Sequence, residues 1–109
     1  MAYDDVLADR LRERLAPRAA ISERRMFGSL VFFTHGNMTI GVSGDDLIVR
    51  LGAEAASAAL ERPGVRTFDL TRRPMRNWVL VEGSTLDDPE LDAWLASATA
   101  FVSTLPAKE

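Results

Sequence analysis

His35 is the one histidine of the chain, and the chain contains no cysteine. These counts exclude a metal site built on a histidine pair or on thiolates, and they exclude acid–base catalysis by two histidines. His35 precedes Gly36-Asn37, a sequence typical of a tight hairpin turn. We interpret His35 as a solvated turn residue rather than a lone general base, because no Gly-x-Ser-x-Gly sequence supplies a nucleophile for it.

Two pairs of adjacent carboxylates occur, Asp45-Asp46 and Asp87-Asp88. Neighbouring side chains on a strand point to opposite faces, so such a pair cannot easily share a metal ion or a proton. The first pair follows Ser43-Gly44 and suits a hairpin turn, whereas the second precedes Pro89 and suits the start of a helix. Neither pair has a third ligand nearby in the sequence. Residue chemistry therefore predicts a protein that is not an enzyme and that needs no metal ion or cofactor.

Arginine clustering is the polar feature that points to binding. Residues 62–76 contain five arginines, and Trp78 and Phe68 are close to them in sequence. The planar fork of arginine suits the carboxylates of a protein partner, which is the interpretation that we favour. The alternatives are direct nucleic-acid binding through residues 62–76, against which a net charge of -3 argues mildly, and a solvated loop.

The expected contact residues combine this cluster with the Arg24-Arg25 pair and nearby apolar side chains. Phe27 is a further possible apolar anchor. For all the apolar members simple core packing is the alternative, above all for Phe27 and Trp78. The candidates are Arg24, Arg25, Met26, Arg72, Arg73, Met75, Arg76 and Trp78.

The hydrophobic period along the chain predicts the elements that hold these residues. Apolar residues repeat every four positions over residues 3–15, which predicts a helix. Strands are predicted at 21–27, 30–34, 38–42 and 47–51, where the period is two. The break at Gly28-Ser29 fits either a turn or a bulge within one bent strand.

The second half of the chain is predicted to contain two helices and two strands. A short helix follows at 53–60, then strands at 66–70 and 77–82 joined by a basic loop over 71–76. A last helix has Asp87 as its cap and Pro89 at its first position, and its apolar stripe runs to Leu105.

The order helix, four strands, short helix, two strands, helix predicts a single two-layer α+β domain over residues 1–109. Short connections imply an antiparallel sheet, covered on one face by the first and last helices. The apolar strand residues are too many for one covered face, so we expect a homodimer to bury the remainder. They are Val31, Phe33, Met38, Ile40, Val42, Ile48, Trp78 and Leu80.

The cell compartment is predicted from what the sequence lacks. The acidic N-terminus has no signal-peptide pattern, and no apolar stretch approaches the roughly 20 residues of a membrane span. We therefore expect a soluble cytoplasmic protein.

Four segments in a particular order carry a family resemblance. They are Arg24-Arg25-Met26-Phe27-Gly28, Gly36-Asn37-Met38, Gly41-Val42-Ser43-Gly44-Asp45-Asp46-Leu47-Ile48-Val49-Arg50 and Arg73-Pro74-Met75-Arg76-Asn77-Trp78-Val79. Over nearly the whole chain the sequence resembles the N-terminal domain of the TfoX/Sxy family. The resemblance implies a secretion-chaperone-like α+β fold and a regulator of natural competence that acts with the cyclic-AMP receptor protein. It implies no catalytic residues, and it identifies the chain as a single-domain member without the helical C-terminal domain.

Overall fold

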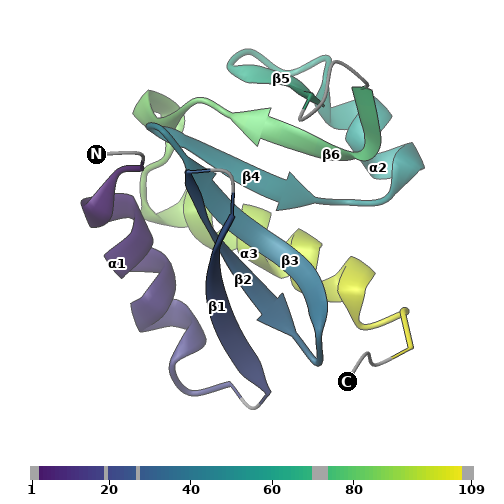
Figure 1. The fold of residues 1–109 in the computed structure, drawn as a ribbon. Helices are drawn as coiled ribbons and strands as arrows, with labels where there is room; N and C mark the ends of the chain where they lie inside the picture. Colours follow the sequence, from purple (N-terminus) through teal and green to yellow (C-terminus); the bar gives the residue numbers. More distant parts are fainter. Residues whose placement is uncertain (1–2, 19, 27, 70–73, 107–109) are drawn as a thin grey trace.

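The computed structural model describes residues 3–18, 20–26, 28–69 and 74–106, and it contains a six-stranded antiparallel sheet with three α-helices (Figure 1). The helices are α1 (Asp5–Leu15), α2 (Ala53–Ala59) and α3 (Asp88–Val102), and a 3-10 turn, η1 (Gly83–Thr85), precedes α3. The strands are β1 (Ile21–Met26), β2 (Ser29–Thr34), β3 (Asn37–Ser43), β4 (Asp46–Arg50), β5 (Val65–Asp69) and β6 (Pro74–Val81). They lie in the order β1-β2-β3-β4-β6-β5. The predicted order of elements and the α+β class are confirmed.

Aspartate caps begin the two long helices. The Asp4 carboxylate accepts hydrogen bonds from the backbone N–H groups of Val6 and Leu7 at the start of α1, and Asp87 accepts one from Glu90 at the start of α3. The Asp87 cap was predicted. Pro89 is the second residue of α3, not the first as predicted, because Asp88 already has helical geometry.

Tight turns join the first four strands. His35 and Gly36 have φ values of 50° and 79°, the left-handed backbone that a two-residue hairpin turn requires, so the predicted β2–β3 turn is confirmed. Met26 pairs with Ser29, which makes the β1–β2 connection a full hairpin turn. The alternative of a bulge at Gly28-Ser29 is therefore wrong. The irregularity in this region lies instead between Phe32 and Phe33, in the pairing of β2 with β3.

Strand β6 begins earlier than the sequence predicted. Met75 and Arg76 belong to the strand rather than to a basic loop over 71–76, and the strand starts at Pro74. Proline is tolerated there because it is the first residue of the strand. The ladder between β4 and β6 begins at Trp78, and the preceding Asn77 accepts hydrogen bonds from the backbone N–H groups of Leu51 and Gly52, which follow β4.

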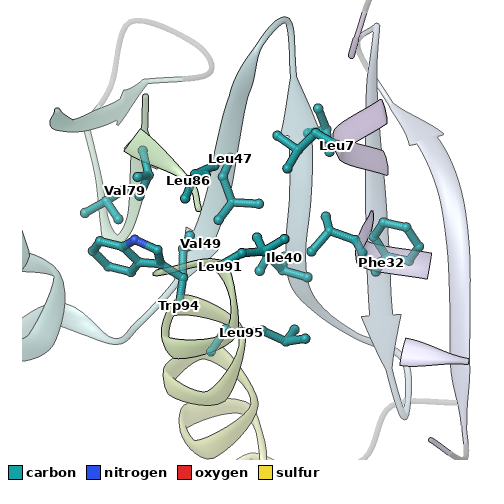
Figure 2. Close-up of a cluster of buried hydrophobic side chains, with 14 of the residues drawn as sticks. Leu7, Phe32, Ile40, Leu47, Val49, Val79, Leu86, Leu91, Trp94 and Leu95 are labelled. Atoms are coloured by element: carbon teal, nitrogen blue, oxygen red, sulfur yellow. The ribbon is translucent and has the colours of Figure 1, made fainter. Parts of the chain in front are cut away.

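All three helices pack on the same face of the sheet. Figure 2 shows Leu91, Trp94 and Leu95 of α3 against Ile40 and Val49 of the sheet. Leu7 of α1 and Phe32 of β2 continue the same core, as do Ala56 and Ala59 of α2. Burial of these side chains is the main stabilising contribution to the fold. None of the helices in the described part of the chain is long and apolar enough to cross a membrane.

The opposite face of the sheet, called the open face below, carries a second and smaller cluster. Ile48, Phe68 and Trp78 are buried there, and Met38, Met75 and Leu80 pack around them partly exposed. The apolar strand residues thus divide between the two faces, with Ile40 and Val42 in the main core. Within the described ranges the exposed large hydrophobic residues are Val6 and Leu60, neither of which is in a strand. The open face is therefore half-buried rather than fully exposed.

Candidate functional site

The open face can be followed along one line of paired residues from edge to edge, called the open-face row below. Each residue of the row is the strand partner of the next, and both ends are arginines at the edges of the sheet. The middle of the row is apolar. The row consists of Arg24, Val31, Gly41, Ile48, Leu80 and Arg66.

Arg24 and Arg25 lie on opposite faces of β1. The Arg24 guanidinium lies 5.2 Å from the ring centre of Phe33 on the open face, and Met26 is on the same side of the strand. Arg25 is paired with Leu30, a residue of the main core, and therefore points to the helix side. The structure thus brings Arg24 and Met26 together and separates Arg25 from them.

Two arginines of the basic segment 62–76 form ion pairs with carboxylates of this chain. Arg62 donates to Glu90 at 2.9 Å and lies 4.7 Å from the ring centre of Trp94, and Arg66 pairs with Asp46. Arg76 is exposed. The predicted contact residues Arg72 and Arg73, and the possible anchor Phe27, lie outside the described residues.

The predicted apolar contact residues of β6 belong to the open-face cluster. Trp78 is 7% exposed, and its ring centre lies 6.0 Å from that of Phe68. Met75 packs against the same cluster and is partly exposed. Trp78 therefore packs as a core residue would, whereas Met75 keeps some surface available for a partner.

Arg50, which the sequence analysis did not single out, lies beside Trp78 at the end of β4. Its guanidinium carbon is 5.3 Å from the ring centre of Trp78 and 5.7 Å from that of Phe101 in α3. One terminal nitrogen, Nη1, donates to the carbonyl of Met38 at 3.1 Å, while Nε is buried without a hydrogen-bond partner. Burial lowers the pKa of Arg50. No sequence signal marks this site, because Phe101 is distant along the chain.

A shallow and largely open groove of about 520 Å³ adjoins the Phe101 ring. Gly52 has a φ of 86°, and a Cβ at this position would lie 2.6 Å from Cε1 of Phe101. Glycine is therefore required for the ring to approach the backbone where α2 begins. The groove is lined by Leu51, Gly52, Ala53, Glu54, Ala55, Ala58 and Phe101.

Comparison of the sequence with models of known protein families shows which family this domain belongs to. The sequence model of the TfoX N-terminal domain matches residues 13–102. The chain belongs to the TfoX N-terminal domain family. The match runs from α1 to the last residue of α3 and includes the whole open-face row, and it confirms the predicted resemblance. Neither a protein of curated function nor a solved structure matched the chain.

His35 occupies an exposed position in this TfoX N-terminal domain, at the tip of the β2–β3 hairpin as predicted. It also borders a pocket of about 320 Å³ between that hairpin and the end of α3. The other residues that line the pocket carry no second titratable side chain. They are Thr34, Asn37, Thr99, Val102, Ser103 and Leu105. Across the described ranges, no group of three histidine, cysteine or acidic side chains is placed to hold a metal ion.

Proposed function

We propose that this TfoX N-terminal domain is a non-enzymatic regulatory module that binds the acidic surface of a protein partner on its open face. Membership of the family suggests a competence-related regulatory module. Action on transcription through that partner is part of the proposal. The observation that carries it is the uneven distribution of ion pairs between the two sides of the sheet.

Most ion pairs of the described residues lie on the helix side. Arg10 and Arg14 both reach Asp88, and Arg14 also reaches Asp92. Arg12 bonds Asp9 and Glu23, and Arg62 bonds Glu90. These guanidinium groups have their counter-charges within the chain, so they offer little to a partner.

The open face has one such pair, Arg66 with Asp46. Arg24 and Arg50 have no described carboxylate within 4.0 Å, and neither has the exposed Arg76 of β6. Arg24 and Arg50 lie on the same face of the sheet as the partly exposed Met38 and Leu80. Arg76 follows the partly exposed Met75 along β6. Cationic groups around apolar contact area complement an acidic protein surface.

A homodimer is a second, separate proposal. The partly exposed side chains of Phe33, Met38 and Leu80 support a second copy that covers part of the open face. Such a dimer would compete with the acidic partner for the same surface, so the two proposals can be measured against each other.

Direct nucleic-acid binding receives less support from the described residues. Two of the arginines of segment 62–76 are engaged with Glu90 and Asp46, and the chain is acidic overall. We therefore keep nucleic-acid binding as an outcome of the tests and not as the proposal.

Affinity purification of the tagged protein from its native cell supplies candidate partners, and titration of a purified partner then tests the surface. We expect Arg24→Glu and Arg76→Glu each to weaken binding at least about tenfold, or about 1.4 kcal/mol. Arg18→Glu is the matched control, because Arg18 is exposed on the connection between α1 and β1. Full affinity of both the Arg24→Glu and the Arg76→Glu variants, or an equal loss in the control, would contradict the proposal.

A further inference from the structure

Strand β1 is an edge strand whose outer side has no strand beside it in the described part of the chain. In the sheet order it pairs with β2 alone, and its residues 22–25 are exposed. The other edge strand, β5, has an irregularity between Thr67 and Asp69, whereas the register of β1 with β2 is continuous and β1 contains no proline. Bulges and prolines are two features that keep edge strands from pairing with other chains. Of the two edges, β1 is therefore the one that can accept a further strand.

The hydrogen bonds between β1 and β2 show which backbone groups of β1 point outward. In an antiparallel pair, every second residue exchanges hydrogen bonds with the partner strand. The N–H group of His35 donates to the carbonyl of Ala20 at 2.9 Å, and this pair continues the register of β1 with β2, so the bonded residues have even numbers. The N–H and C=O groups of Glu23 and Arg25 therefore point away from β2. Among the described residues these groups have no hydrogen-bond partner.

The side chains of Arg24 and Arg25 lie on the two faces of this free edge. Arg24 faces the open side and Arg25 the helix side, and both are exposed. Neither has a described carboxylate within 4.0 Å. The acidic residue of the strand, Glu23, is already held by Arg12 at 2.8 Å. A strand beside β1 therefore meets one unpaired positive charge on each face of the sheet.

This charge pattern favours an acidic strand over a second copy of the chain. Cross-strand neighbours on one face attract when their charges are opposite and repel when they are alike. Two copies paired edge to edge are related by a two-fold axis, which places one residue opposite its own copy. At the middle of β1 that residue is Glu23, Arg24 or Arg25, so like charges face each other across the axis. The Glu23 carboxylate, which could offset this repulsion, is already held by Arg12.

A partner strand with two consecutive acidic residues fits the same edge without repulsion. Neighbouring side chains of a strand alternate between the faces, so two consecutive carboxylates lie one on each face. One of them then lies opposite Arg24 and the other opposite Arg25. The next residue, beside Glu23, has to be uncharged, because a third carboxylate at this position would be repelled.

We propose that β1 accepts an extended acidic segment of a partner protein as a further strand of the sheet, with two consecutive carboxylates beside Arg24 and Arg25. This inference rests on the proposed function, since it specifies how the acidic partner is bound. It adds that recognition uses backbone hydrogen bonds as well as charge.

Nuclear magnetic resonance titration of the full chain with a capped hexapeptide tests the edge without the natural partner. The acidic probe is acetyl-Thr-Val-Glu-Glu-Val-Thr-amide, added up to about 10 mM, which detects dissociation constants near 1 mM. We expect the backbone amide proton signals of Glu23 and Arg25 to move downfield, because each gains a hydrogen bond. The signals of Ser22 and Arg24 should move less, because these amides are already bonded to β2.

Two matched probes separate backbone pairing from charge attraction. The glutamine peptide, acetyl-Thr-Val-Gln-Gln-Val-Thr-amide, keeps the backbone but loses both carboxylates, and it should bind about fivefold more weakly. The acidic probe with an N-methyl group on both glutamates keeps the carboxylates but lacks one donor on each of its two edges. It should bind at least about tenfold more weakly, because the methyl groups also block the approach of the strands.

Variants of the protein make the same separation. Arg25→Gln removes one charge and should weaken the acidic probe about two- to threefold. Arg25→Pro also removes an outward N–H group, which an edge strand tolerates because this group is not bonded to β2, and it should leave no detectable binding. Arg76→Gln is the control and should keep full affinity, since β2, β3 and β4 lie between β6 and β1. Thermal unfolding checks that each variant is folded.

The inference is overturned if either control peptide binds as tightly as the acidic probe, if no peptide binds, or if Arg25→Gln and a folded Arg25→Pro both keep full affinity. A downfield shift of Glu23 and Arg25 that grows with protein concentration in the absence of peptide would assign the edge to a second copy. That result would also overturn the inference.

Failure of this inference can be distinguished from failure of the proposed function, because Arg25 is not on the open face and Arg76 is not at the β1 edge. Partner binding that depends on Arg76 but not on Arg25 would refute the added strand and leave the proposed docking surface standing. Binding of the acidic probe at β1, combined with partner binding that ignores Arg24→Glu and Arg76→Glu, would refute the docking surface and leave the β1 edge site standing.

Discussion

Arg12 and Glu23 form a two-pronged ion pair that ties α1 to the edge strand β1. Arg12 donates from Nε and Nη2 to the two carboxylate oxygens of Glu23, at 3.0 and 2.8 Å. Edge strands are prone to pair with other chains, and charged side chains limit this. The pair therefore holds β1 to the helix layer. It also means that the Glu23 carboxylate, on the helix side of this edge strand, already has a counter-charge within the chain.

The first prediction concerns the coupling energy of this pair. Both side chains are about 40% exposed, at 39% and 42%, so solvent screens the attraction. We expect a double-mutant cycle of Arg12→Met and Glu23→Gln to give a coupling free energy of about 0.5–1 kcal/mol, measured by urea unfolding at neutral pH. A coupling near zero would show that the ion pair does not stabilise the fold.

The second prediction is that the free energy of unfolding falls in acid, because the ion-paired carboxylates of Glu23 and Asp88 become protonated. Hydrogen bonds from Arg12 lower the pKa of Glu23, and hydrogen bonds from Arg10 and Arg14 lower the pKa of Asp88. A depressed carboxylate pKa stabilises the fold above its unfolded value, and this stabilisation is lost as the pH falls through the folded value. The coupling between Arg12 and Glu23 should therefore shrink at about pH 3, and a pH-independent coupling would contradict this account.

The elements that local chemistry determines were predictable from sequence. The left-handed backbone at His35-Gly36 and the Asp87 cap depend on a few neighbouring residues, and the structure has both. The Arg24-Arg25 pair shows where this reasoning was incomplete. Side chains alternate along a strand, so adjacent arginines separate onto two faces, although the sequence suggested one basic group.

The contacts of Arg50 and the start of β6 could not be predicted in the same way. Arg50 meets Trp78 and Phe101 through tertiary packing of a strand and a helix, which no local pattern encodes. Strand β6 begins at Pro74 because β5 lies beside it, whereas proline in the sequence suggested a loop. In both cases contacts between residues distant along the chain determine the local structure: side-chain packing at Arg50 and strand pairing at Pro74.

The third prediction concerns the glycine in the middle of the open-face row. A Cβ on Gly41 would lie 2.6 Å from the carbonyl oxygen of Leu30 and 3.2 Å from Cα of Val31. Because backbone atoms cannot easily move aside, we expect Gly41→Ala to lower the free energy of unfolding by about 2–3 kcal/mol. Gly44→Ala is the control: its φ is 58° with no atom within 4 Å of the new Cβ, so only backbone strain of about 1 kcal/mol is expected. Equal losses in the two variants would exclude the close contact as the cause.

The fourth prediction is a dimeric mass in solution. The partly exposed side chains of Phe33 and Leu80 lie on the open face and are the apolar surface that a second copy would cover. We expect light scattering at high micromolar concentration to give twice the 12.0 kDa chain mass. Leu80→Asp should return the protein to the monomer, whereas Val6→Asp, an exposed position in α1, should not. A monomeric wild-type protein would remove the homodimer.

The fifth prediction separates protein binding from nucleic-acid binding. Each phosphate neutralised on duplex DNA contributes a slope of about -0.9 to the logarithm of affinity against the logarithm of salt concentration. Arg62 and Arg66 already hold Glu90 and Asp46, so moving them to phosphates would break these ion pairs. We therefore expect no gel shift of duplex DNA at about 50 mM salt. If the wild-type protein does shift duplex DNA, the variant Arg66→Gln tests where the DNA binds. A salt dependence of affinity that becomes shallower by about one unit in this variant would show that Arg66 neutralises a phosphate, and would place the nucleic acid on segment 62–76.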